Sequence, residues 1–440
     1  MAPSISAELV HSPDRVVVWR PAPQAILVAA IVFAVFLGLR TDWIPHQPNC
    51  DLPCHPLPGE TLIGIEAAER LLSEGSRYWF LQQVAEGGDV KIYTHNVNID
   101  AYIQYPIRLA GVKSHVPLAL VNAASFFIGV WLGYVVVLRA TKDPFTALLF
   151  LFFFATTYYF NLLFVFNLRA WHWLGLFGVL TCTLLMNGDE RDRKRGEVWI
   201  FPAAFVAFAN SYDFAAEVAA AALALAVLYR NLHSAGFVLA AFASAFAIRQ
   251  VQVIGAVGVE TWATDLWYTA LIKTGFLANL FGKPDIAQIQ AWYDEHAILR
   301  YPAVPGMMSL VDHGKLFGAL FSEYWMPYFG MALMPSLLGF FCYRHPAWRF
   351  LVATTIGIAA GLLFFSPYSI HFAVKHAVPL LLFPFCVSTA ILASSAVSIK
   401  KIGRLLLFAV IAIHVAVQAR NWYSFPLSDQ PFPVWSTIGR

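Results

Sequence analysis

The stretch VPLALVNAASFFIGVWLGYVVVL, residues 116–138, contains no charged side chain. A helix crosses the hydrocarbon core of a bilayer with about 20 apolar residues, so this stretch is long enough to do so. Similar apolar runs recur along the chain, at about 25–39, 144–160, 170–187, 198–210, 214–229, 235–255, 324–342, 350–366, 376–396 and 405–419. The fold class that this pattern predicts is all-α, a polytopic membrane protein with about 11 transmembrane helices.

The composition excludes most other classes of protein. Of 440 residues, 59% are hydrophobic and 12% are charged, whereas soluble chains carry about 25% charged residues. The abundance of Phe, Trp and Tyr excludes a disordered chain, and an outer-membrane β-barrel would show short alternating segments instead of continuous apolar runs. The net charge is only +3, and no basic stripe with interleaved aromatic residues is present, so nucleic acid is excluded as a partner.

The basic residues predict how the chain is oriented in the membrane. If the N-terminus is cytoplasmic and the spans alternate, every short cytoplasmic loop carries Lys or Arg, as the positive-inside rule requires. These loops hold Arg139 and Lys142; Arg191, Arg193, Lys194 and Arg195; Arg230; Arg344 and Arg349; and Lys400, Lys401 and Arg404. Two long loops then lie on the non-cytoplasmic side. The first apolar run is not followed by a small-residue cleavage site, so we expect it to remain as an uncleaved span.

The same topology divides the chain into regions. The expected regions are a cytoplasmic N-terminal segment (1–22), a membrane module (23–255) that includes the first long outer loop (41–115), a second long outer loop (256–323), C-terminal transmembrane helices (324–419) and an outer tail (420–440). The pattern of apolar and charged residues in the first outer loop predicts two amphipathic helices that lie in the membrane interface, over 60–74 and Ile99–Leu109. The second carries the aromatic residues typical of an interface, namely Trp262, Trp267, Tyr268, Trp292 and Tyr293.

Two cysteines of the first outer loop are spaced as C-x-x-x-C. Cys50 and Cys54 lie in a Pro-rich polar stretch, where an oxidising compartment favours a disulfide. The alternative is a metal site that adds His46 or His55. Cys182, Cys342 and Cys386 lie within apolar runs, where we expect them to pack as small side chains.

The candidate general bases are carboxylates of the first outer loop. Glu60 opens the first interfacial helix at headgroup height, where a carboxylate can accept a proton from a hydroxyl or help to bind a divalent cation. The alternative is that Glu60 only caps the helix. Glu66 lies on the same helix and is the second candidate, whereas Glu69 and Glu74 are expected on its solvated face.

A second polar group lies just before the second interfacial helix. His95, Asn96 and Asp100 could bind phosphate oxygens, sugar hydroxyls or a metal, and the alternative is an Asn/Asp turn with a helix cap. Asp213 and Glu217 follow the short run 198–210, and their i, i+4 spacing puts both on one face of a helix. Ionisable groups within spans are functional candidates, and a broken helix at such a place often borders a cavity.

Basic groups at the outer ends of spans are candidates for binding phosphate. Arg169 is either a phosphate partner or an interfacial anchor, and Arg249, beside Gln250 and Gln252, has the same two interpretations. His371, Lys375 and His376 begin the tenth span and suit a lipid phosphate or pyrophosphate. The chain has no Walker-type phosphate loop, dinucleotide glycine fingerprint or HEXXH motif. A transfer reaction outside the membrane would therefore need a donor delivered in the lipid.

The layout resembles the GT-C superfamily of polyprenyl-phosphate-sugar-dependent glycosyltransferases, especially its protein-mannosyltransferase and aminoarabinose-transferase branch. The resemblance covers roughly residues 20–395 as architecture. The segments that are similar to the family's motifs are Gly59-Glu60 through Leu71, Leu72 and Gly75; Thr94-His95-Asn96-Val97-Asn98; Asn167-Leu168-Arg169; and His371 to Pro379.

The resemblance implies a membrane glycosyltransferase of cell-envelope glycan biosynthesis, in a bacterial inner or plasma membrane. It would transfer a sugar from a polyprenyl-phosphate donor to a hydroxyl of a glycan, lipid or protein acceptor at the outer leaflet. Glu60, or else Glu66, Asp89 or Asp100, would act as general base, while Arg169, Lys375 and His376 would neutralise the departing phosphate. His371 would join this phosphate site, and His95, Asn96, Asp213 and Glu217 would bind substrate. No cofactor is implied with certainty, since some branches use a divalent metal and others use none. The rival classes are a secondary transporter and a lipid-carrier flippase with intramembrane carboxylates.

Overall fold

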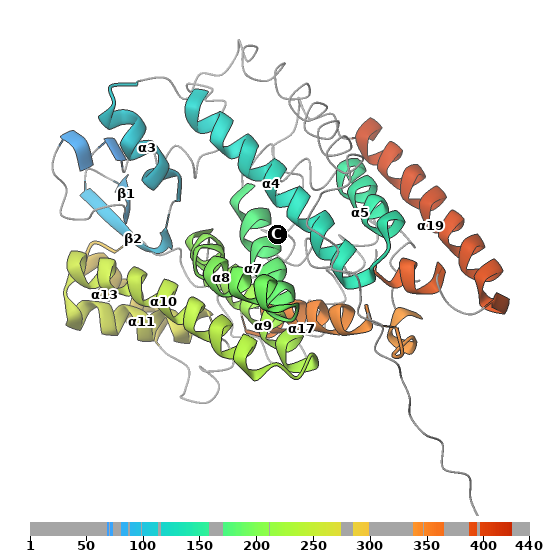
Figure 1. Cartoon of the computed structure of the whole chain (residues 1–440). Coiled ribbons are helices and arrows are strands. Elements are labelled where there is room, and N and C mark those ends of the chain that lie inside the picture. Colours follow the sequence, from blue (N-terminus) through green and yellow to red (C-terminus); the bar gives the residue numbers. More distant parts are fainter. Residues whose placement is uncertain are drawn as a thin grey trace, which may run out of the picture.

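The computed structural model describes residues 68–69, 71–73, 81–86, 89–97, 99–112, 116–157, 170–210, 212–273, 285–298, 338–345, 347–364, 387–393 and 397–424. Most of these residues are helical. The long helices are α4 (Val116–Thr141), α5 (Pro144–Thr156), α7 (Ala170–Met186), α8 (Glu190–Asn210), α9 (Tyr212–Leu228), α10 (Leu232–Val257), α17 (Trp348–Phe364) and α19 (Val397–Ser424). Figure 1 shows α7 and α8 at the centre of the molecule, with α5 and α19 on one side and α11 and α13 on the other.

Eight of the apolar runs are therefore helical, as predicted. Within the described residues, three stretches are long and apolar enough to cross a membrane: Ala124–Thr141 of α4, Leu232–Val257 of α10 and Lys401–Arg420 of α19. The helix predicted over 198–210 starts earlier, because α8 begins at Glu190 with a charged first turn containing Glu190 and Asp192. The predicted break after it is confirmed, since α8 ends at Asn210 and α9 begins at Tyr212.

The helices pack through an apolar core that α4, α5, α7, α8, α9 and α17 share. Glycines allow the closest approach between α7 and α8. A Cβ added at Gly175 would lie 2.7 Å from the Cα of Ala207, and one added at Gly196 would lie 2.7 Å from the carbonyl oxygen of Cys182. Because both obstacles are backbone atoms, these two helices pack at a distance that only glycine permits.

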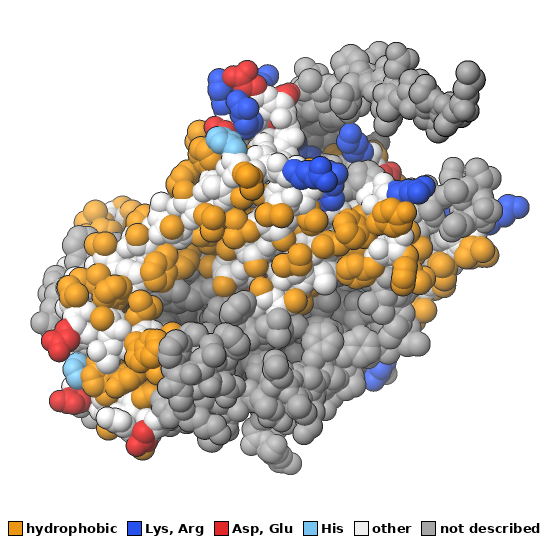
Figure 2. Space-filling model, turned by 90° about the horizontal axis from the view of Figure 1, so that it is seen from below, with side chains coloured by type: hydrophobic (Ala, Val, Ile, Leu, Met, Phe, Trp, Pro, Cys, Tyr) orange, Lys and Arg blue, Asp and Glu red, His pale blue; other side chains and the backbone are white. Residues whose placement is uncertain are grey.

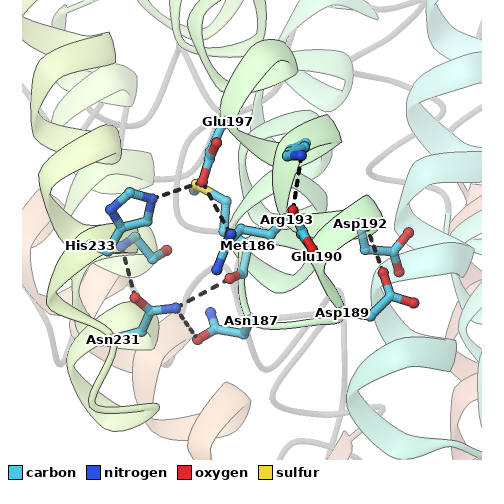
Figure 3. Close-up of polar contacts among 11 residues, drawn as sticks. Met186, Asn187, Asp189, Glu190, Asp192, Arg193, Glu197, Asn231 and His233 are labelled. Atoms are coloured by element: carbon cyan, nitrogen blue, oxygen red, sulfur yellow. Dashed lines mark hydrogen bonds and ion pairs between the residues drawn. The ribbon is translucent and has the colours of Figure 1, made fainter.

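One end of the bundle, which we call the basic end, collects the turns between consecutive helices (Figure 3). Arg139 of α4 forms an ion pair with Asp192 of α8, with 3.0 Å between Nη1 and Oδ2. The Asn231 side-chain amide donates to the carbonyl oxygen of Met186 at 3.2 Å and to Asn187 Oδ1 at 3.0 Å. The Arg349 guanidinium of α17 lies 5.0 Å from the ring centroid of Tyr229. Loops predicted to share one side of the membrane thus meet in space.

The opposite end, which we call the hairpin end, contains β1 (Leu81–Glu86), β2 (Asp89–Val97), α3 (Ile99–Leu109), α11 (Val259–Lys273) and α13 (Ile286–Glu295). The two strands are antiparallel, and Glu86 pairs with Asp89. The described residues are mostly helical, as predicted, and the all-α prediction did not include this small sheet. Its physical basis is Gly87-Gly88 between two short segments, a dipeptide that favours a tight hairpin, with Ile92 and Thr94 alternating inward along β2.

The hairpin end joins the two segments that were predicted to be separate outer loops. The Ile92 backbone N–H donates to the Ala297 carbonyl oxygen at 2.8 Å, and Ile92 forms a parallel bridge with Ile298. Lys91 Nζ lies 3.0 Å from Asp294 Oδ1. The helix predicted over Ile99–Leu109 is confirmed as α3 with the same bounds. The described parts of the first and second long loops are thus in direct contact.

Figure 2 shows a broad apolar surface between the two ends, with charged side chains gathered above it and at the lower left. Exposed apolar residues of α8 and α10 include Val198, Trp199, Leu239, Ile248 and Val251. Soluble monomers rarely expose a continuous apolar surface of this kind, so it fits contact with lipid.

Candidate functional site

The most deeply buried charged groups of the hairpin end lie where β2, α10 and α11 meet. Arg249 of α10 is 1% exposed, Asp265 of α11 is 5% exposed and Thr94 of β2 is 2% exposed. Arg249 lies eight residues before the end of α10 at Val257, which is about 12 Å along the helix axis. A buried arginine at this depth is costly unless hydrogen bonds and an opposite charge compensate it.

Arg249 and Asp265 each form a hydrogen bond with Thr94 of β2. Arg249 Nη2 donates to the carbonyl oxygen of Thr94 at 3.0 Å, and Thr94 Oγ1 donates to Asp265 Oδ2 at 2.8 Å. The hydroxyl of Thr269 lies 3.5 Å from the other carboxylate oxygen of Asp265. We call this arrangement of Arg249, Thr94 and Asp265 the Thr94 clamp. It is neutral overall, and it fixes both the main chain and the side chain of Thr94.

The residues that follow Arg249 extend the contacts to α3 and α11. Gln250 Oε1 accepts a hydrogen bond from Trp262 Nε1 at 2.6 Å. The amide of Gln252 donates to the phenol oxygen of Tyr102 in α3. Burial raises the pKa of Tyr102, although the Gln252 hydrogen bond and the Arg249 charge act in the opposite direction. The phenol therefore stays protonated at neutral pH, and α10 holds both β2 and α3.

A second face of α3 carries Ala101, Gln104 and Arg108, which are spaced three and four residues apart. Gln104 is fully buried, and neither atom of its side-chain amide has a partner among the described residues. Arg108 Nη2 lies 2.9 Å from Glu69 Oε1. This ion pair brings the helical residues 68–69 and 71–73 of the first predicted interfacial helix next to α3. Glu69, expected to be only a solvated charge, is half-exposed and paired.

Three of the predicted site residues belong to the chain just beyond the clamp. His95 and Asn96 follow Thr94 directly in β2, and Asp100 is the second residue of α3. Their side chains lie outside the description that the structure provides. What the structure does place is the backbone that carries them, between the Thr94 clamp and the Tyr102–Gln252 contact.

The two predicted carboxylates of α9 lie on a different part of the molecule. Asp213 is the second residue of α9, and the position of its side chain is not described. Glu217 is 4% exposed, on the helix that packs against α17. A Cβ added at Gly357 of α17 would lie 2.9 Å from the Glu217 carbonyl oxygen, so the two helices cross closely at this level.

The remaining candidates lie outside the described residues. They are Glu60, Glu66, Arg169, His371, Lys375 and His376, together with the proposed disulfide partners Cys50 and Cys54. Within the described ranges, no group of three or more His, Cys, Asp or Glu side chains is placed to hold a metal ion. Tyr293 was expected among the aromatic residues of the membrane interface. It is instead fully buried and packs against Tyr268 and Trp292.

Sequence reasoning missed Asp265, Tyr102 and Gln104. A signal for Asp265 was present, because it is an acid among Trp262, Trp267 and Tyr268, in a segment otherwise suited to an interface. Arg249 was recognised as a polar group near the end of an apolar run, but nothing in the sequence connected it with Thr94.

In comparisons with known proteins, no protein-family model and no curated protein matches the chain.

Proposed function

We propose that the protein is a membrane glycosyltransferase that transfers a sugar from a polyprenyl-phosphate donor to an acceptor hydroxyl at the outer leaflet. The observation that carries the proposal is the hairpin end, where two segments distant in sequence form one unit held by the buried Thr94 clamp. Connecting loops do not need a buried Arg and Asp. A catalytic surface does, because its groups must be held in fixed positions.

The proposed reaction is supported by the residue types that the sequence offers for each of its roles. Asp100, or Glu60 or Glu66 of the first interfacial helix, would take the proton of the acceptor hydroxyl. His95 and Asn96 would hydrogen-bond sugar hydroxyls, and Arg169, His371, Lys375 and His376 would neutralise the phosphate that leaves with the lipid. The acceptor is a glycan, lipid or protein, and membrane lipids surround the apolar surface.

The test is a deletion of the gene in its own organism, followed by complementation. If the protein uses a lipid-linked sugar, the deletion strain accumulates that lipid and lacks the sugar on a surface acceptor, and the wild-type gene restores both. Complementation with Glu60→Gln and Asp100→Asn identifies the base. Surface glycans and lipid-linked sugars that are unchanged in the deletion strain would rule the proposal out.

Glu217 supports a second candidate, a secondary transporter or a lipid-carrier flippase. A carboxylate that is 4% exposed on an apolar helix is costly in a membrane and is typical of ion or substrate pathways. Asp213→Asn and Glu217→Gln separate the two functions. Loss of solute uptake with intact surface glycans would favour the transporter, whereas lipid-linked sugar confined to the cytoplasmic leaflet would favour the flippase.

A further inference from the structure

We infer that Arg249, Thr94 and Asp265 are positioning residues that fix the segment 95–100 for the reaction, an inference that rests on the proposed function. Thr94 immediately precedes His95 and Asn96, and Asp100 is the second residue of the helix that follows. Displacing this segment would displace three predicted substrate-binding or basic groups together.

The geometry fixes this segment from both sides. Before it, the carbonyl oxygen of Thr94 accepts from Arg249 and the Thr94 hydroxyl donates to Asp265. After it, the Tyr102 phenol accepts from Gln252, which lies three residues beyond Arg249 on the same helix. A single helix, α10, therefore holds β2 at one end of the segment and α3 at the other.

The third support comes from the second outer segment. Asp265 lies on α11, and the strand before Thr94 is joined to the end of α13 through Ile92 and Lys91. The contact between Thr94 and Asp265 spans 171 positions, and the contact between Arg249 and Thr94 spans 155. Long-range polar contacts of this kind are unnecessary for burying apolar surface, but they set the angle between strand and helices.

Burial makes the arrangement specific. A Lys at position 249 presents one compact charge and loses the planar guanidinium. A Val at position 94 keeps the shape of Thr but removes the hydroxyl, which leaves the Asp265 carboxylate with one hydrogen bond fewer in a buried place. Ser keeps the hydroxyl. The pair Thr94→Val and Thr94→Ser therefore isolates a single hydrogen bond with little change in side-chain volume.

The experiment uses the full-length protein and makes two measurements. Hydrogen exchange by mass spectrometry follows residues 89–97 in detergent. Transfer is followed by adding the purified protein to membranes of the deletion strain, which hold unused donor and unmodified acceptor, and measuring the loss of lipid-linked sugar. Arg139→Gln is the matched control, because it breaks a partly buried ion pair at the basic end.

We expect Thr94→Val, Arg249→Lys and Asp265→Ala to speed exchange across 89–97 and to lower the maximal transfer rate roughly ten- to a hundredfold. The donor concentration at half-maximal rate should change much less. Thr94→Ser should restore both measurements. Arg139→Gln should lower the melting temperature and leave exchange in 89–97 and the transfer rate near those of the wild type.

The positioning role is overturned if exchange rises in Thr94→Val while transfer is unchanged, or if Arg139→Gln slows transfer equally. Unchanged exchange in all clamp variants would show that the contacts do not hold the strand, and would also overturn it. If the wild-type protein consumes no lipid-linked sugar, the proposed function fails and the positioning role fails with it. The exchange data separate these cases, since they report on the clamp without any reaction.

Discussion

At the scale of single residues, the buried side-chain amide of Gln104 leads to a prediction about thermal stability. Its amide is fully buried and has no partner among the described residues. Such a group costs about 1–3 kcal/mol in lost hydration. We predict that Gln104→Leu, which keeps the approximate volume, raises the temperature of thermal unfolding in detergent.

Gln104→Ala provides the control, because it removes the amide and also leaves a cavity. Its unfolding temperature should fall below that of the wild type. If Gln104→Leu instead lowers the unfolding temperature by several degrees, the amide is hydrogen-bonded in the folded protein. A rise in stability together with loss of transfer would indicate that a substrate hydroxyl supplies the missing partner.

The partly buried position of His345 leads us to predict that the free energy of unfolding depends on pH. It lies just before α17, and its Nδ1 accepts a hydrogen bond from the Ala347 backbone N–H at 3.2 Å. Burial lowers the pKa of His345 below its ordinary value. The unfolded chain therefore takes up the proton first, so the free energy of unfolding should fall as the pH drops below about 6.5.

Replacing His345 by Asn keeps an acceptor suited to the start of a helix and removes the titrating ring. We expect the unfolding temperature of His345→Asn to fall less between pH 7 and pH 5 than that of the wild type. Thermal unfolding at several pH values measures this difference. Identical pH profiles would show that other groups set the acid limit of stability.

At the scale of the elements, α7 and α8 pack closely at Gly175. A methyl group at Gly175 would meet the Ala207 backbone at 2.7 Å. We predict that Gly175→Ala destabilises the protein by about 1–3 kcal/mol, because neither helix can give way without moving its backbone. Gly236→Ala in α10 is the control, since nothing lies within 4 Å of the added Cβ.

Gly236→Ala should leave stability unchanged or raise it by about 0.5–1 kcal/mol, because Ala restricts the unfolded chain and favours helix. Chemical unfolding of both variants in the same detergent makes the comparison. An equal loss of stability for the two glycines would contradict close packing of α7 on α8.

The elements that were predictable from sequence are those with a strong one-dimensional signal. Long apolar runs identified α4, α7, α9 and α10, because a continuous apolar segment has few alternatives to a helix. The start of α8 was missed, because its charged first turns carry no apolar periodicity. The β1–β2 hairpin was missed because Leu81–Glu86 and Asp89–Val97 lie in a Gly-rich polar stretch that has no long apolar run.

The candidate site was only partly predictable, for a different reason. His95, Asn96 and Asp100 could be selected because polar residue types cluster locally. The contact between Asp265 and Thr94 could not be predicted, since contacts that span more than a hundred positions have no signature in a single sequence. Arg249 was predicted as a phosphate partner or an interfacial anchor, whereas its contact with Thr94 depends on how distant segments fold together.

At the scale of the whole molecule, the two ends differ in the kind of charge they carry. The basic end exposes Lys142, Arg191, Arg195 and Arg230 beside two acids, Asp189 and Glu190, whereas the hairpin end exposes Asp285, Asp294 and Glu295. The apolar surface of Figure 2 separates these ends. The positive-inside rule predicts that the basic end is cytoplasmic and that the hairpin end lies outside.

This orientation is testable with two exposed positions, Arg191 at the basic end and Ala287 in α13. In intact spheroplasts, a membrane-impermeant maleimide should label Ala287→Cys at once and Arg191→Cys only after permeabilisation, with the wild-type protein reporting labelling of the native cysteines. The reverse pattern would put the hairpin end in the cytoplasm, where soluble nucleotide sugars are available. A lipid-linked donor is required only if the hairpin end lies outside, so this labelling decides whether the proposed donor class is chemically necessary.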